Sequence, residues 1–196
     1  MAIGEIVATY LGRGRDGKHR LLGSLADSLL LYARGRGAAI RRDRGTRLIL
    51  ALAAYLSVAS ALSIARMPHF RAYANDWWTL GLGIAITLSG AALRDWSILS
   101  LGRYFRREVT IEPGQTLIRR GPYRALRHPS YLGLALIFAG FGLAFGSWVS
   151  AGVALLIILA GLLPRIGVEE HALAQTFGAE YAAYASSTAR MLPHVW

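Results

Sequence analysis

Apolar residues along this chain form long runs separated by arginine-rich segments. The run Leu48–Ala65 has about the length of a membrane-spanning helix, which needs roughly 20 residues, and Pro68 follows its end. A second run begins at Trp77-Trp78, a pair typical of the membrane interface. It extends to about Ala92, and Arg94 marks its exit. The pattern therefore predicts an all-α protein with two spans in its first half.

The longest apolar run, Tyr131–Leu163, covers about 33 residues and is too long for one span. Gly146-Ser147-Trp148 in its middle carries a turn signal, which predicts a hairpin of two helices. Pro164 is expected to close the second helix, because proline interrupts the hydrogen bonding of a helix. Residues 165–185 are predicted to form a further helix that leaves the membrane.

The short apolar segment Leu21–Tyr32 leaves two alternatives open. It has only about a dozen residues, and basic side chains flank it on both sides. Such a segment is more typical of a helix lying in the interface than of one crossing the bilayer. We predict a basic N-terminal segment, 1–47, with an interfacial or short membrane helix, followed by a membrane domain, 48–196. Four spans are expected, or five if Leu21–Tyr32 crosses.

Lysine and arginine are distributed unevenly between the predicted loops. Residues 34–47 carry six, residues 66–76 carry two and residues 103–130 carry seven. Because cytoplasmic loops are enriched in these residues, the alternation places both termini and the long basic loop in the cytoplasm. Residues 103–130 and 165–196 then lie on the same side of the membrane and can meet.

The composition agrees with an integral membrane protein, because 54% of the 196 residues are apolar. The chain has no cysteine, which excludes disulfides, thiolate metal sites and cysteine nucleophiles. Its net charge of +11 indicates contact with anionic headgroups rather than with nucleic acid. A phosphate-binding loop and a Gly-x-Gly-x-x-Gly fingerprint after an apolar strand are both missing, so no nucleotide-binding fold is indicated.

Candidate chemistry gathers at the start of the hairpin. His128 precedes Pro129, which disfavours a helical conformation at His128, so its ring is expected just before a helix that begins near Ser130. The first turn of that helix presents backbone N–H groups that could bind a cofactor carboxylate. A lone histidine is more often a hydrogen-bonded structural residue. The remaining histidines lack the spacing of metal ligands, so no metal is predicted.

Charged residues follow directly where the hairpin ends. Arg165 and Glu169 are four residues apart and therefore share one face of a helix. They could form an ordinary surface ion pair. Alternatively, they could be functional groups, because charged residues at the membrane boundary are costly and often functional. Glu170 points about 100° away, so a solvated position is expected for it. Tyr123 and Tyr131 could stack on a flat ring or anchor the chain at the interface.

Leu117 to Gly133 ends in Arg-His-Pro-Ser-Tyr-Leu-Gly. Together with Glu-Glu-His-Ala-Leu at 169–173 and Phe-Gly-Ala-Glu-Tyr at 177–181, it resembles the isoprenylcysteine carboxyl methyltransferase family over about residues 80–196. Membrane sterol reductases share the Arg-His-Pro-x-Tyr-x-Gly piece, usually with glutamate after the glycine. Leu134 stands there in this chain, which weighs against NADPH.

The resemblance implies a polytopic membrane methyltransferase that uses S-adenosylmethionine at a cytoplasmic site. Arg165 is implied as the catalytic residue that contacts the substrate. Glu108 stands where the family carries glutamine. The residues implied to line the cofactor site are Gln115, Thr116, Leu117, Ile118, Tyr123, His128, Pro129, Ser130, Tyr131 and Glu169.

The implied reaction is methyl esterification of a carboxylate on a lipophilic, isoprenylcysteine-like substrate. Eukaryotic members methylate prenylated proteins, but the loops of this chain are very short, so a small lipophilic acid is an equal alternative. A carboxylate is ionised at pH 7 and needs no general base. The first alternative is a phosphatidylethanolamine N-methyltransferase, in which His128 or Glu170 would have to remove a proton. A membrane reductase and a non-enzymatic scaffold are the alternatives from other classes.

Overall fold

The computed structural model describes residues 45–70, 77–102 and 116–192. Leu21–Tyr32, Glu108 and Gln115 lie outside these ranges. The described residues form the helices α3 (Thr46–Ala65), α4 (Trp77–Leu101), α5 (Pro129–Ala144), α6 (Trp148–Phe177) and α7 (Ala179–Ser187), with short 3-10 turns η2 (Pro68–Phe70) and η4 (Gly121–Arg124). Within the described ranges, strand-like pairing is limited to one isolated bridge between Leu126 and Ala189. The predicted all-α class is confirmed.

Three helices, α3, α4 and α6, are long and apolar enough to cross a membrane. The apolar helix α5 has 16 residues, about 24 Å at 1.5 Å per residue, against a hydrocarbon core of roughly 30 Å. Helices α5 and α6 form the predicted hairpin. Its turn contains Gly146, whose φ of 76° suits glycine. The expected polytopic helical membrane protein is therefore confirmed, with a shorter first arm in the hairpin.

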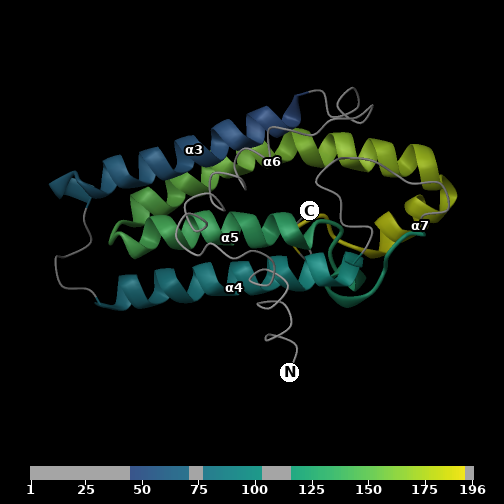
Figure 1. Ribbon diagram of the computed structural model, residues 1–196, viewed down its shortest axis with the longest axis horizontal. Helices are drawn as coiled ribbons and strands as arrows, with labels where there is room; N and C mark the ends of the chain where they lie inside the picture. Colours follow the sequence, from purple (N-terminus) through teal and green to yellow (C-terminus); the bar gives the residue numbers. More distant parts are fainter. Residues whose placement is uncertain (1–44, 71–76, 103–115, 193–196) are drawn as a thin grey trace, which may run out of the picture. The chain divides into compact units, whose positions relative to one another are not determined.

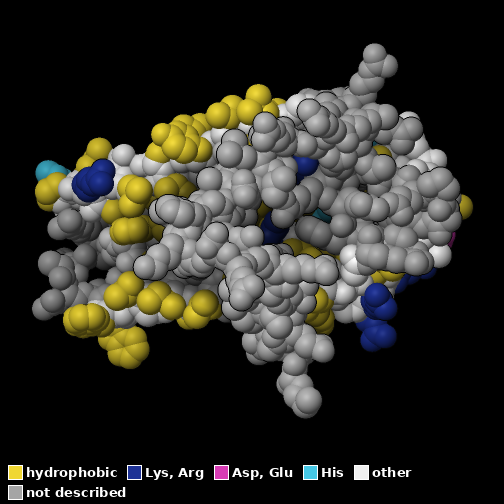
Figure 2. Space-filling model, in the orientation of Figure 1, with side chains coloured by type: hydrophobic (Ala, Val, Ile, Leu, Met, Phe, Trp, Pro, Cys, Tyr) yellow, Lys and Arg dark blue, Asp and Glu magenta, His cyan; other side chains and the backbone are white. Residues whose placement is uncertain are grey.

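The four long helices lie side by side in the order α3, α6, α5 and α4 (Figure 1). Large apolar side chains are exposed on the outer two helices, among them Leu52 and Leu56 on α3 and Leu88 on α4. Figure 2 shows such side chains gathered over both helices. Burying this surface in lipid is favourable, because each Å² of apolar area removed from water contributes about 25 cal/mol.

Glycines bring α4 and α5 into backbone contact. A Cβ added to Gly90 would lie 2.6 Å from the carbonyl oxygen of Gly133, and one added to Gly133 would lie 2.6 Å from the carbonyl oxygen of Gly90. Close packing of small residues is a common way for membrane helices to associate. The contact fixes the first turns of α5, which carry part of the candidate site, against α4.

The expectation that Pro164 closes a helix is wrong. Helix α6 continues through Pro164 to Phe177. Membrane helices tolerate proline because neighbouring groups satisfy the freed backbone carbonyl. The helix ends instead before Gly178, whose φ is 50°, and α7 follows. Arg165 and Glu169 therefore belong to the same rigid helix as the second arm of the hairpin.

Candidate functional site

The centre of the candidate site is a three-residue network between α5 and α6. The Arg165 Nε atom donates a hydrogen bond of 2.7 Å to the Tyr131 hydroxyl and lies 3.1 Å from Glu169 Oε1. The Tyr131 hydroxyl in turn donates to Glu169 Oε1. Only 5% of Arg165 is exposed. A buried guanidinium is tolerated when it is paired and hydrogen-bonded, and this network supplies both conditions.

His128 joins the network as the residue that precedes α5. Its ring stacks on that of Tyr131, with centroids 5.6 Å apart and an interplanar angle of 10°. Its two nitrogens face two carboxylates, with Nδ1 3.7 Å from Glu169 Oε2 and Nε2 3.5 Å from Glu170 Oε1. The imidazole therefore lies between the paired glutamates of α6.

Glu170 is not solvated, contrary to the sequence-based expectation. Its side chain is 15% exposed and lies within ion-pair distance of two arginines. Arg127 Nε is 2.8 Å from Oε1, and Arg190 Nε is 2.9 Å from Oε2. Neither arginine lies within a helical turn of Glu170 along the chain, so helix geometry alone gave no indication of them.

The start of α5 is held by Arg94 of α4. The Nη1 atom of Arg94 donates to Ser130 Oγ at 3.0 Å and to the Ser130 carbonyl at 3.4 Å. The N–H groups of Tyr131 and Leu132 donate to the His128 carbonyl. The predicted anion site at the start of α5 therefore offers fewer N–H donors than expected. Pro129 has no N–H, and those of Tyr131 and Leu132 already donate to the His128 carbonyl. From the sequence, Arg94 was interpreted only as the end of a membrane-spanning helix, and its contact with Ser130 was not predicted.

Tyr123 lies beside the network, in η4, and is 8% exposed. Burial raises the pKa of its hydroxyl well above the usual range, and the nearby Glu169 carboxylate raises it further, while Arg94 lowers it. The hydroxyl is therefore neutral at pH 7. The backbone carbonyl of Tyr123 accepts a hydrogen bond of 2.8 Å from Tyr184 of α7.

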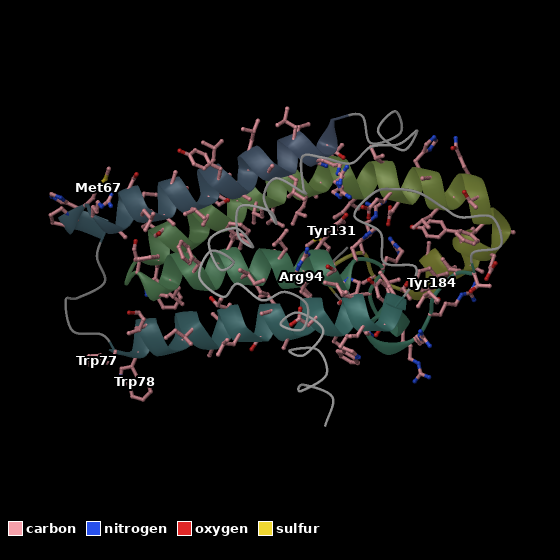
Figure 3. All side chains as sticks on the ribbon, in the orientation of Figure 1. Met67, Trp77, Trp78, Arg94, Tyr131 and Tyr184 are labelled. Atoms are coloured by element: carbon pink, nitrogen blue, oxygen red, sulfur yellow. The ribbon has the colours of Figure 1, made fainter. Side chains whose placement is uncertain are left out.

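The structure thus brings together most of the site residues expected from the sequence. One turn contains His128, Pro129, Ser130 and Tyr131, and α6 brings Arg165 and Glu169 to it. Figure 3 labels Tyr131 of this turn and Arg94 of the neighbouring helix α4. Thr116 is exposed, and Leu117 and Ile118 are half-buried. Within the described residues, no hydrogen bond or ion pair joins these three to the network, so their place in the site remains a prediction.

Groups of three His, Asp or Glu residues that could hold a metal ion are absent from the described part of the chain. The metal-free site remains a prediction. Sequence reasoning missed Arg94, Arg127 and Arg190, since each acts on a residue far away in the sequence. Their only signal was their position beside the predicted membrane boundary and in the basic segments.

Comparison with known proteins identifies the family. The profile of the isoprenylcysteine carboxyl methyltransferase (ICMT) family matches residues 82–175. The chain is 32% identical over 147 residues to protein-S-isoprenylcysteine O-methyltransferase A of Arabidopsis thaliana, and 31% identical over the same length to methyltransferase B of that plant. Each alignment covers 74% of this chain and 74% of the relative.

A solved structure agrees with this assignment at the level of the fold. It is that of the eukaryotic intramembrane Ras methyltransferase ICMT, with a TM-score of 0.65 and 24% identity. The match covers 72% of this chain and 52% of the other, so this chain spans about half the length of that protein. The profile and the plant relatives carry the assignment beyond the fold: the chain belongs to the isoprenylcysteine carboxyl methyltransferase family and is an integral membrane methyltransferase.

Proposed function

We propose that the chain uses S-adenosylmethionine to methyl-esterify the carboxylate of a lipophilic, isoprenylcysteine-like acid. The observation that carries this proposal is the buried Arg165, which lies at the end of an apolar hairpin and is joined through Tyr131 to a carboxylate. A guanidinium at such a boundary suits a substrate with an apolar tail and an anionic head.

The residues of the network fit the proposed cofactor. Glu169 is 22% exposed, so its carboxylate can still reach a ligand with a positive or hydroxylated part. The stacked rings of His128 and Tyr131 and the nearby Tyr123 offer aromatic surface for a flat base. When bound, S-adenosylmethionine supplies a methyl group that its sulfonium already activates for displacement.

The chain's own residues then have to align and dehydrate the reacting groups. A carboxylate with a free pKa of roughly 4 is ionised at pH 7, so no residue of the site has to act as a base. Good alignment can contribute roughly 7–11 kcal/mol. The planar fork of Arg165, whose Nε atom contacts Tyr131 and Glu169, would bind the substrate carboxylate. Arg165 is only 5% exposed, which limits the access of water to this contact.

The proposal extends to topology and organisation. Residues 48–196 form the methyltransferase domain, and residues 1–47 form a basic segment that precedes it. The distribution of basic residues between the loops supports a cytoplasmic position for both termini and the cofactor site. The partners are a lipidated or small lipophilic substrate and membrane lipids. Reporter fusions at the two ends test this topology, and reporters on opposite sides of the membrane would contradict it.

A methyl-transfer assay with labelled S-adenosylmethionine tests the function. The purified protein is offered prenylcysteine analogues, fatty acids and phosphatidylethanolamine in separate reactions. The expected product carries label that mild base releases as methanol, because an ester hydrolyses under these conditions and an N-methyl group does not. Label that resists base on phosphatidylethanolamine would replace the proposal with N-methylation. Transfer to none of these acceptors, with no binding of S-adenosylhomocysteine, would refute it.

A further inference from the structure

The chain beyond α7 returns to the start of α5 and pairs with it. We name residues Thr188–Met191 the C-terminal strap. The Ala189 N–H donates to the Ala125 carbonyl at 3.0 Å, and the Arg127 N–H donates to the Ala189 carbonyl at 2.8 Å. The next bond along runs from the His128 N–H to the Arg190 carbonyl at 2.9 Å. Figure 1 shows this return, where the chain leaves α7 and comes back beside the beginning of α5.

Side chains fasten the same strap through Glu170. We name residues Ala125–His128, which pair with the strap, the His128 segment. One oxygen of the Glu170 carboxylate contacts Arg127 of this segment, and the other contacts Arg190 of the strap. The Nη1 atom of Arg127 also donates to the carbonyls of Ala185, at 2.7 Å, and Thr188. One carboxylate thus bridges two guanidiniums that belong to the two paired segments. Without it, both guanidiniums would lose this acidic partner, and the Arg127 side chain is only 11% exposed.

The strap contacts the candidate site through His128. The backbone N–H of this residue bonds the strap, while its ring stacks on Tyr131 and lies beside Glu169. Met191, at the end of the strap, is 3% exposed, so the strap is buried at this end. A displaced strap would therefore release the residue that fixes the Tyr131 ring and one side of the Glu169 carboxylate.

We name the two ion pairs of Glu170, with Arg127 and with Arg190, the Glu170 latch. We propose that this latch and the C-terminal strap position the cofactor site, by holding the His128 segment against Glu169 and Tyr131. Glu170, Arg127 and Arg190 are positioning residues in this assignment, since they act through His128 and not on the reacting atoms. The proposal rests on the proposed function insofar as the site it shapes is that of S-adenosylmethionine.

The absence of cysteine from the chain allows a direct test of strap opening. Ala189→Cys places a single thiol on the strap, and Ser186→Cys places one on an exposed position of α7 as a reference. Each is combined with Glu170→Gln, which keeps the size of the side chain and removes its charge. Thiol labelling rates and S-adenosylhomocysteine binding by calorimetry are measured on the full chain in detergent. Glu180→Gln, which removes an exposed ion pair with Arg119, is the matched control.

Glu170→Gln is expected to speed labelling at Ala189→Cys by about tenfold or more, because local opening becomes easier. Labelling at Ser186→Cys should not change. The same substitution should weaken S-adenosylhomocysteine by about tenfold, since small displacements of positioning groups are costly. Glu180→Gln should change neither quantity. Arg190→Gln, which removes the contact of the strap with Glu170 and leaves Arg127 in place, should reproduce both effects and serves if Glu170→Gln fails to fold.

Unchanged labelling at Ala189→Cys in both latch variants would overturn the assignment of Glu170 as the latch. Faster labelling with unchanged S-adenosylhomocysteine affinity would overturn the positioning role. If the unmodified chain binds no S-adenosylhomocysteine at all, the proposed function fails, and the labelling rates still decide whether Glu170 holds the strap.

Discussion

Arg165 and Tyr131 are 34 positions apart in the sequence, yet the Arg165 Nε atom donates to the Tyr131 hydroxyl at 2.7 Å. The same hydroxyl donates to Glu169. Tyr131 thus connects the residue proposed to hold the substrate with the residue proposed to hold the cofactor. The relationship requires that α5 and α6 keep a fixed register, which the short turn around Gly146 provides.

Tyr131→Phe should remove the hydroxyl that bridges Arg165 and Glu169, while their direct contact of 3.1 Å remains. A hydrogen bond to a charged group contributes about 1.5–3 kcal/mol, so we expect kcat/KM to fall by about tenfold or more. The measurement is a double-mutant cycle with Glu169→Gln. Residues in one network show interaction energies of about 0.5–3 kcal/mol. Effects of the two substitutions that simply add would contradict a coupling through the tyrosine.

Gly90→Ala should destabilise the protein by about 1–3 kcal/mol, the usual cost of overpacking. The new Cβ would lie 2.6 Å from the carbonyl of Gly133, which the α5 backbone cannot easily move. Gly81→Ala on the same helix is the matched control, because its Cβ would meet nothing within 4 Å. Thermal unfolding of both variants in one detergent checks this. Equal melting temperatures would show that the α4–α5 contact adapts freely.

Stability should fall at alkaline pH through the buried tyrosines outside the membrane. Burial raises the pKa of Tyr184 to about 12 and that of Tyr123 in the same direction, against roughly 10 in an unfolded chain. The unfolded state then releases its protons first, so this contribution is complete below pH 10 and is lost as the pH rises from 10 towards 12. Melting temperatures between pH 9 and 11.5 measure it. Tyr184→Phe should flatten the decline, and an unchanged slope would contradict the assignment.

The sequence predicted well what depends on local pattern. The hairpin and its turn follow from runs of apolar residues interrupted by a turn signal, and the structure confirms both. The position of Arg165 near a membrane boundary stays a prediction. The identity of the central residues came from a family resemblance, and the structure brings His128, Tyr131, Arg165 and Glu169 together.

Features that depend on tertiary contact were missed. Pro164 is an ordinary helix breaker by local rules, but surrounding helices allow α6 to continue through it. Glu170 was expected in solvent because its helix face differs from that of Glu169. The strap that brings Arg190 to it, and the turn that brings Arg127, are set by packing that no periodicity encodes.

Arg165→Lys should reduce turnover far more than it reduces cofactor affinity. Lysine keeps the charge but loses the planar fork that binds a carboxylate in two places. Losing one charge-stabilising donor costs about 2–4 kcal/mol in transition-state stabilisation. Turnover and S-adenosylhomocysteine affinity are measured on the same preparation. Near-normal turnover in Arg165→Lys and Arg165→Ala would contradict the proposal that Arg165 binds the substrate carboxylate. Arg165 would then only anchor the chain at the membrane boundary. An amine substrate predicts that removing the cation is neutral or helpful.

Glu169→Ala should give the opposite pattern and weaken the cofactor first. The carboxylate contacts Arg165 and Tyr131 through Oε1, and Oε2 faces His128. Its removal takes away the one acidic group of the central network and leaves the Arg165 charge without this partner, which in buried pairs costs about 3–5 kcal/mol. Glu169→Gln separates these effects, because it keeps the hydrogen-bonding shape and loses only the charge. We expect S-adenosylhomocysteine to bind Glu169→Gln more weakly while the protein stays folded. If Glu169→Gln lowers turnover at saturating cofactor and leaves affinity unchanged, Glu169 acts on Arg165 and the substrate instead, and the cofactor must be held elsewhere.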